Sequence, residues 1–163
     1  MIRMKKWIKE IFIVAVLVFI LSNIISYLRK PELNSSQLPT ATVQLMDGTS
    51  YRLKEGKPVL IHFWATWCRT CKMEAANIEH VSKKYEVLTI AVNSGDDEKI
   101  KEYLHDKGLT FRVLNDKEGS WAQIFKVKAF PTTFMYDAKG KIKFTEVGYT
   151  TTAGLLARMA LLE

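Results

Sequence analysis

The longest unbroken run of apolar positions lies near the N-terminus. Residues 11–28 read IFIVAVLVFILSNIISYL and include no charged side chain. A helix rises about 1.5 Å per residue, so this run would cross most of a hydrocarbon core about 30 Å thick. Trp7 and Tyr27 lie near its two ends, where aromatic rings favour the membrane interface. We therefore predict a transmembrane signal anchor over residues 11–28.

Basic residues flank this run unequally, with four before it and two shortly after it. The positive-inside rule then keeps residues 1–10 in the cytoplasm as a basic tail. The chain is then a single-pass protein of the inner (cytoplasmic) membrane, and the residues after the anchor lie in the periplasm. A cleaved signal peptide is an alternative, but the exit SNIISYLRK lacks the usual small-residue A-x-A-like pattern. A buried core helix is a second alternative.

After the apolar run the pattern changes twice. Residues 29–40, RKPELNSSQLPT, contain two prolines and two serines and predict a short linker. From residue 41 onward, short apolar runs alternate with amphipathic segments. The segments ATVQLM and SYRL flank Asp47-Gly48, a hairpin signal. VLIHFWA and VLTIAVN are almost wholly apolar, which is typical of strands buried on both faces of a sheet.

Helical periodicity fills the intervals between the predicted strands. The expected helices are one over about residues 68–85, one capped by Asp96 and stopped by Gly108, a brief one that Ser120 caps, and a last one that Thr150 caps. Three more strands are expected at LTFRVL, residues 132–136 and residues 141–147. Strands that alternate with helices and end in a hairpin predict an α/β domain with a central mixed sheet over residues 41–163.

Charge is distributed unevenly along the chain. The formal net charge is +7, from 24 basic and 17 acidic residues. Residues 1–30 contain six basic residues and one acid, whereas residues 31–163 contain 18 basic and 16 acidic residues. The excess of positive charge therefore belongs to the N-terminal segment. That position favours a membrane partner and argues against binding to nucleic acid.

The candidate chemistry lies in Trp67-Cys68-Arg69-Thr70-Cys71, which contains the only two cysteines. They follow a predicted buried strand and begin a predicted helix, one turn apart. That spacing fits the Cα separation of about 4.4–6.8 Å that a disulfide needs. The helix N-terminus and the positive charge of Arg69 favour a thiolate at Cys68. We expect Cys68 to attack and the deeper Cys71 to resolve the mixed disulfide.

Two cysteines in one chain can also serve other purposes. A structural zinc site needs four ligands, and besides the cysteines the chain offers only the scattered His62, His80 and His105. A purely structural disulfide would close a very small loop and stabilise little. Peroxidase chemistry usually needs a separate cysteine with an activating Thr and Arg, and the sequence lacks that arrangement. Binding of Cu(I) by the two soft thiols remains an alternative. We expect no metal and no cofactor apart from the redox-active disulfide.

Two motifs resemble known proteins. WATWCRTC resembles the thioredoxin superfamily, and KVKAFPTTFMYDAKGKI is similar to its membrane-anchored TlpA- and ResA-like thiol–disulfide oxidoreductases. SGDD and GYTTTAGLLARM look like the suppressor-of-copper-sensitivity protein D type of that family. Over residues 41–163 the resemblance implies a thioredoxin fold preceded by an added hairpin. It also implies an enzyme that exchanges disulfides with proteins, together with a membrane electron donor or acceptor.

The resemblance assigns roles to four further residues. Pro131 matches the family's cis-proline, whose loop faces the cysteines and presents a backbone edge to substrate, and Phe130 before it would touch that substrate. Trp67 matches the aromatic residue that precedes the first cysteine. Glu74, three residues after the second cysteine, would accept or relay a proton near the cysteines, with a solvated helix acid as the alternative.

Three positions depart from the family pattern. His62 stands where thioredoxin has a buried aspartate, and it is either a proton relay or a hydrogen-bonded residue under the sheet. Arg-Thr separates the cysteines where many relatives have a proline, and Ala76 replaces a helix-kinking proline, so the helix should run straighter. The resemblance implies that the protein reduces its partners, whereas Arg69 argues mildly for oxidation. A periplasmic Cu(I)-binding module for copper tolerance is the alternative function.

Overall fold

The computed structural model of the chain describes residues 2–28, 31, 37–53 and 56–163. The chain divides into two compact units, residues 1–30 and residues 31–163. In the first unit, the helix α1 spans Ile2–Leu28, and its described apolar side chains are exposed. Over the described residues, no helix has both the length and the hydropathy that crossing a membrane requires. The transmembrane anchor therefore stays a prediction.

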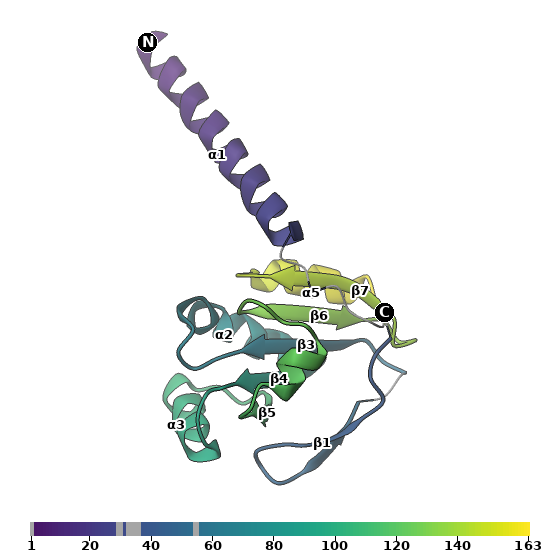
Figure 1. Ribbon diagram of the computed structural model, residues 1–163. Coiled ribbons are helices and arrows are strands. Elements are labelled where there is room, and N and C mark those ends of the chain that lie inside the picture. Colours follow the sequence, from purple (N-terminus) through teal and green to yellow (C-terminus); the bar gives the residue numbers. More distant parts are fainter. Residues whose placement is uncertain (1, 29–30, 32–36, 54–55) are drawn as a thin grey trace. The chain divides into compact units, whose positions relative to one another are not determined.

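The second unit is built on a five-stranded mixed sheet (Figure 1). Its strands, in the order in which they lie side by side, are β5 (Arg112–Asp116), β4 (Glu86–Val92), β3 (Val59–Trp64), β6 (Thr132–Tyr136) and β7 (Ile142–Val147). β3, β4 and β5 are parallel, whereas β6 and β7 are antiparallel to their neighbours. This arrangement confirms the predicted thioredoxin-type sheet with its antiparallel terminal hairpin.

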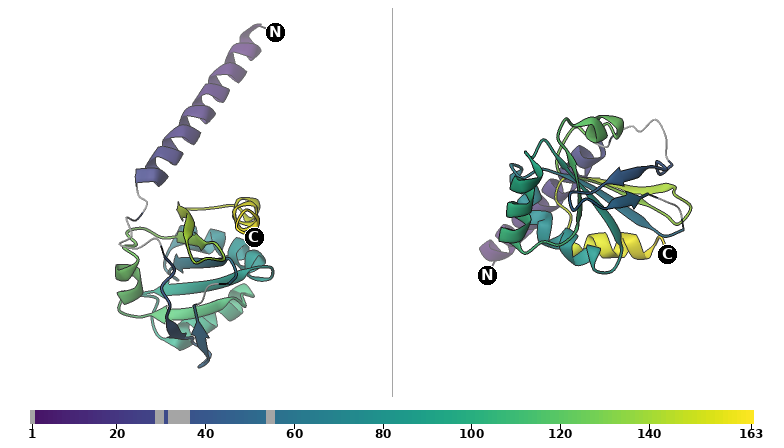
Figure 2. Two further views of the ribbon diagram at one scale, coloured as in Figure 1. Left: turned by 90° about the vertical axis from the view of Figure 1, so that its right-hand side faces the viewer. Right: turned by 90° about the horizontal axis from the view of Figure 1, so that it is seen from below.

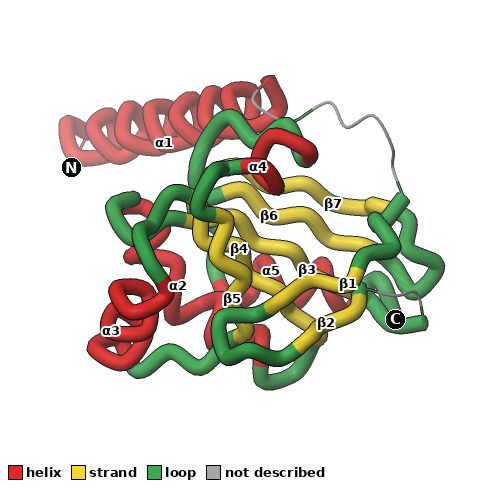
Figure 3. The backbone as a smooth tube through the Cα atoms, turned by 60° about the horizontal axis from the view of Figure 1, so that its bottom comes forward, coloured by secondary structure: helices red, strands yellow, loops and turns green. Residues whose placement is uncertain are grey.

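Helices cover both faces of the sheet (Figure 2). One face packs against α2 (Arg69–Ser82), α3 (Asp97–Lys107) and α5 (Thr152–Ala160). The other face packs against α4 (Ser120–Ile124) and the hairpin of β1 (Thr42–Gln44) and β2 (Ser50–Arg52), which also lies beside β5 (Figure 3). Every residue of β3 is buried because alternate side chains enter the two separate apolar clusters.

The structure places the start of the domain earlier than residue 41. Residues 29, 30 and 32–36 of the predicted linker lie outside the described residues. Its described end, however, packs onto the domain, since Gln37 pairs with Lys141 and Leu38 is buried in the core. The backbone N–H of Leu38 also donates to the carbonyl of Gly140, at 2.7 Å. The family resemblance and the charge pattern gave no indication of these contacts.

The predicted helix ends are partly right. Asp96 caps α3 by accepting a hydrogen bond from the Lys99 N–H, and Gly108 ends it in a left-handed conformation. The prediction that Ser120 caps α4 was wrong. The carboxylate of Asp116 instead accepts the backbone N–H groups of Trp121 and Ala122, because β5 ends just before this helix.

The last helix and the fifth strand are also shifted from their predicted positions. Thr151, not Thr150, caps α5 and accepts from the Gly154 N–H. The segment LTFRVL was expected to be a strand, but β5 starts only at Arg112 and extends to Asp116. Pairing with β4 sets these limits, since the ladder begins opposite Leu88.

Candidate active site

The junction between β3 and α2 positions the two cysteines. Cys68 is the N-cap residue of α2, and its sulfur accepts a hydrogen bond of 3.1 Å from the Cys71 backbone N–H. The two residues form a disulfide with their Cα atoms 5.3 Å apart. Both residues are buried: Cys68 is 8% exposed and Cys71 is 2% exposed. The Cys71 N–H in the first turn of the helix therefore points at the Cys68 sulfur, where it and the positive end of the helix dipole would stabilise a thiolate.

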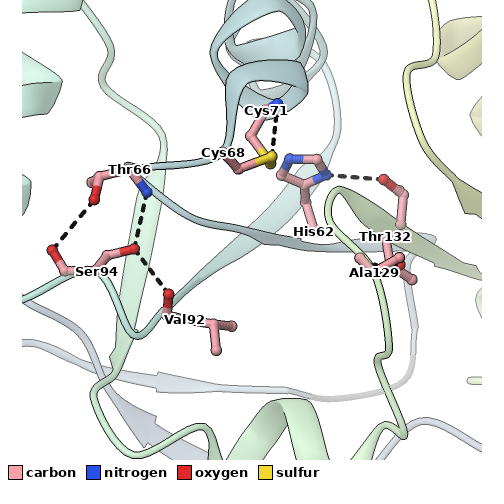
Figure 4. Close-up of a disulfide and its surroundings, with 9 residues drawn as sticks. His62, Thr66, Cys68, Cys71, Val92, Ser94, Ala129 and Thr132 are labelled. Carbon is pink, nitrogen blue, oxygen red and sulfur yellow. Dashed lines mark hydrogen bonds between the residues drawn. A yellow bond between two sulfur atoms is a disulfide. The ribbon is translucent and has the colours of Figure 1, made fainter.

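The loop before the cysteines is fastened to the neighbouring strand (Figure 4). The hydroxyl of Ser94, which follows β4, accepts the Thr66 backbone N–H at 3.0 Å and donates to the carbonyl of Val92. Ser94 is itself buried. Reasoning from the sequence missed this residue as a support of the site. The available signal was a small hydroxyl residue directly after a buried strand that adjoins the cysteine-bearing one.

Trp67 forms an apolar platform beside Cys68. Its side chain is 60% exposed, yet its orientation is fixed because its indole N–H donates to the Asn93 carbonyl at 3.1 Å. Its ring meets the ring of Phe130 edge to face, with centroids 5.7 Å apart. The Phe130–Pro131 peptide bond is cis. The loop before β6 thus contacts the cysteine loop directly, as the resemblance implied.

A third loop joins these two. The Gly148 N–H, at the end of β7, donates to the Pro131 carbonyl at 2.9 Å. Tyr149 follows with its side chain 49% exposed. The Thr150 N–H then donates to Glu74 on α2 at 3.0 Å. The segment between β7 and α5 therefore lies beside the cis-proline and is tied to the cysteine-bearing helix.

His62 is part of the immediate surroundings of the disulfide (Figure 4). It is buried to 2% exposure, and its Nδ1 lies 2.9 Å from the Thr133 hydroxyl across the β3–β6 pair. Burial lowers the pKa of His62 to about 3, so the imidazole is uncharged at neutral pH. The expectation of a hydrogen-bonded histidine under the sheet is confirmed.

Glu74 is fully buried on α2, one turn after Cys71. One carboxyl oxygen accepts the Thr150 N–H, and the other has no hydrogen-bond partner among the described residues. Burial, with a smaller contribution from the nearby Glu146, raises the pKa of Glu74 to about 8, although the hydrogen bond from the Thr150 N–H opposes the shift. The alternative of a solvated helix acid is therefore wrong. At neutral pH this side chain holds a proton.

The remaining residues singled out in the sequence lie at the surface. Arg69 is exposed on the first turn of α2, and the helix continues without interruption through Ala76 to Ser82. His80 and His105 are exposed. Within the described part of the chain, no three His, Cys, Asp or Glu side chains gather as a metal site. The structure thus brings Trp67, Phe130 and Pro131 to the disulfide and leaves Arg69 at the surface.

Comparisons with known proteins agree with this geometry. The sequence profile of the Redoxin family matches residues 33–158. The chain is 31% identical over 159 residues to the thioredoxin-like protein YneN of Bacillus subtilis, covering 91% of this chain and 93% of YneN. It is 30% identical over 122 residues to the thiol-disulfide oxidoreductase ResA of Geobacillus thermodenitrificans, and the alignment covers 71% of this chain and 70% of ResA. The crystal structure of the pneumococcal exposed lipoprotein thioredoxin Etrx1 of Streptococcus pneumoniae is similar with a TM-score of 0.64 at 27% identity, covering 75% of this chain and 98% of Etrx1.

Proposed function

The chain belongs to the Redoxin family and is a thioredoxin-like disulfide oxidoreductase, and from this premise we propose that Cys68 attacks partner disulfides and Cys71 resolves them. The proposal rests on one observation above all. The Cys68 sulfur occupies the N-cap of α2 and already accepts a backbone N–H, whereas Cys71 lies within the helix and is more deeply buried. The pair itself is the redox group, so the exchange needs no bound cofactor.

The exchange has two steps. The Cys68 thiolate attacks one sulfur of a partner's disulfide, forms a bond to it, and releases the other sulfur as a thiolate that takes up a proton. Cys71 then loses its proton and attacks Cys68. This step forms the Cys68–Cys71 disulfide and releases the partner's second thiol. Two electrons pass from the chain to the partner, and the same steps in reverse oxidise a partner dithiol.

Neighbouring residues support these steps. The Phe130–Pro131 loop receives the partner segment beside Cys68, and Trp67 provides an apolar surface that its hydrogen bond to Asn93 holds in place. Arg69 adds a positive charge next to the attacking sulfur. Glu74 exchanges a proton with the sulfur of Cys71, because it lies one helical turn from Cys71 and holds a proton at neutral pH.

The proposal includes a membrane tether and an extracytoplasmic domain. The uncharged run of residues 11–28 and the basic residues before it support a single-pass anchor with its N-terminus in the cytoplasm. The similar Etrx1 is an exposed lipoprotein, which supports action outside the cytoplasm. A reporter that is active only in the periplasm, fused after Glu163, should be active. Silence of that fusion, with activity of a cytoplasm-only reporter, would overturn the orientation.

We propose that the chain reduces its partners and is itself reduced by a membrane electron donor. The resemblance to ResA-like proteins supports this direction, and the redox state of the two cysteines in living cells tests it. Alkylation of free thiols after acid quenching should find Cys68 and Cys71 mostly reduced. A mostly oxidised pair would assign the opposite direction of electron flow.

Trapping experiments test the order of the cysteines. Reduced full-length chain in a neutral detergent is mixed with insulin, whose interchain disulfides serve as the probe. Cys71→Ser should accumulate a mixed disulfide with insulin and show no turnover, whereas Cys68→Ser should form none. Wild type should reduce insulin with dithiothreitol as the final donor. Trapping by Cys68→Ser alone would reverse the order, and no reaction by any form would refute the exchange.

A further inference from the structure

Charge is segregated around the disulfide. Three of the segments that form the site, residues 62–73, 119–136 and 147–151, contain no aspartate or glutamate, whereas the loop of Asn93 and Ser94 that supports them continues into Asp96 and Asp97. The three segments contain four basic residues, which we call the basic rim: Arg69, Lys72, Lys126 and Lys128. Residues 31–163 contain 18 basic and 16 acidic residues in all, so the rest of that unit has 14 basic and 16 acidic residues. These three segments therefore have a net charge of +4, whereas the rest of that unit has a net charge of −2.

These segments meet at the site although they are distant in sequence. The contact of Trp67 with Phe130 joins the first to the second, and the hydrogen bond from Gly148 to Pro131 joins the second to the third. Arg69 and Lys72 lie on the first turn of α2, the latter donating its backbone N–H to the Cys68 carbonyl. Two of the basic residues thus lie on the helix that begins at Cys68, and the other two, Lys126 and Lys128, lie on the segment that leads to Phe130.

The basic rim has no charge partner of its own. Its four side chains are exposed, and none of them forms an ion pair with any carboxylate that the structure describes. Two acids on the neighbouring loop are already engaged. Asp96 caps α3, and Asp97 accepts a hydrogen bond from Asn115 and lies 4.0 Å from Lys117. The acid nearest in sequence to the cysteines, Glu74, is fully buried.

Apolar and aromatic groups lie within the same surface. Trp67 is 60% exposed, Met73 64% and Tyr149 49%, and Phe130 is partly exposed beside Trp67. An exposed apolar surface bordered by charged residues is typical of a site that binds another protein. Aromatic groups supply the contact area, and unpaired charges of one sign select and steer a partner of the opposite sign.

We propose that this surface docks a partner segment in which acidic residues flank the reactive cysteine and an apolar residue packs against Trp67 and Phe130. The inference rests on the proposed function, since it names the class of protein that the Cys68–Cys71 pair serves. The acidic side chains pair with the basic rim on either side of Cys68. A partner with basic flanks is repelled by the same four charges, so the rim selects among partners as well as attracting them.

A matched set of peptides tests the proposal. Each peptide has one central cysteine in a disulfide with 2-mercaptoethanol, flanked on both sides by two Asp, two Asn or two Lys. The full-length Cys71→Ser chain, reduced so that Cys68 is its only thiol, attacks the peptide sulfur and releases 2-mercaptoethanol. Mass spectrometry follows the Cys68–peptide adduct. Each rate is divided by the rate of the same peptide with dithiothreitol, which removes the peptide's intrinsic reactivity.

The acidic peptide should react about tenfold faster than the neutral one at low ionic strength, and the basic peptide more slowly. The preference should disappear near 1 M salt, where the screening length is only about 3 Å. Adding Lys126→Gln and Lys128→Gln should reduce the ratio of acidic to neutral rates severalfold. This pair is chosen because it lies off α2 and does not alter the helix that holds Cys68.

The matched control replaces Lys107 and Lys139 with glutamine. Lys107 ends α3 before β5, and Lys139 lies in the turn between β6 and β7, so both are at the end of the sheet opposite the cysteines. The control removes the same charge and should leave the ratio unchanged. Equal rates for all three peptides, or equal effects of the two lysine pairs, would overturn the docking proposal alone. Failure of Cys68 to capture any peptide would instead refute the proposed function.

Discussion

Replacing Glu74 with glutamine tests the electrostatic character of the site's interior. The side chain is fully buried, one of its carboxyl oxygens accepts the Thr150 N–H, and burial raises its pKa to about 8. Glutamine is nearly isosteric with the protonated acid and can accept the same hydrogen bond from Thr150. It differs from glutamate mainly in that it cannot ionise. The substitution therefore removes a pH-dependent contribution to stability and leaves the packing almost intact.

The sign and size of the effect follow from proton linkage. The unfolded chain loses the Glu74 proton near pH 4.5, whereas the folded chain keeps it until about pH 8. The stability that this proton supports is complete below pH 4.5 and is lost as the pH rises to 8, at about 1.4 kcal/mol per pH unit. The free energy of unfolding of Glu74→Gln relative to wild type should therefore rise by about 3–5 kcal/mol across that range.

Urea unfolding of the oxidised full-length chain, followed by tryptophan fluorescence at pH 5, 6, 7 and 8, measures this difference. The disulfide stays intact, so the cysteines do not titrate. Glu79→Gln is the matched control on the same helix. The Glu79 carboxylate accepts the backbone N–H groups of Thr110 and Phe111, and its hydrogen bonds with Lys83 and Thr110 hold its pKa below the usual value in spite of partial burial.

The control should lose stability on substitution, by an amount that is nearly constant from pH 5 to 8. Glu74→Gln should instead gain stability relative to wild type as the pH rises over the same range. The reasoning that Glu74 is a buried, protonated acid would be refuted if the difference in free energy of unfolding between Glu74→Gln and wild type did not change with pH. It would also be refuted if Glu74→Gln, like the control, were less stable than wild type by a constant amount from pH 5 to 8.

Three further predictions concern the surroundings of the cysteines. Because burial lowers the pKa of His62 to about 3, the free energy of unfolding of wild type should fall relative to that of His62→Asn by about 1.4 kcal/mol per pH unit as the pH falls from 6.5. A difference between the two free energies that does not change with pH would contradict this. Trp67→Ala should slow insulin reduction severalfold while changing the free energy of unfolding by less than about 1 kcal/mol, because the ring is mostly exposed; equal loss of rate and stability would point to a structural role. Thr151→Ala should cost about 1 kcal/mol of stability and Thr150→Ala less, in the same urea assay, since only Thr151 caps α5; the reverse order would contradict the observed cap.

Features encoded by short stretches of sequence could be predicted. The strand β3, the disulfide at the start of α2 and the cap at Asp96 each depend on a few adjacent residues. The thioredoxin-type order of elements followed from them. The cis bond before Pro131 is different, because no local pattern requires it. It was expected only from the family resemblance, and the structure has it.

Features that depend on distant residues were missed or left open. Asp116 caps α4 only because β5 ends beside that helix, and Ser94 fastens the cysteine loop only because β4 lies beside β3. The sequence left Glu74 as either a solvated or a proton-exchanging acid. Its burial is decided by the Thr150 segment, which follows it by 76 positions and packs over α2. No pattern within one helix contains that information.

The two buried ionisable groups near the cysteines together restrict how protons move in the exchange. Near neutral pH His62 is uncharged and Glu74 is protonated, so neither places a negative charge beside the Cys68 thiolate. A protonated acid cannot accept a second proton. We infer that Glu74 donates to Cys71 when that sulfur leaves the intramolecular disulfide, and recovers the proton when Cys71 attacks Cys68. Above pH 8 an ionised Glu74 could no longer donate this proton, so the opening of the Cys68–Cys71 disulfide by a partner thiol should slow there, whereas the attack of Cys71 on Cys68 should not.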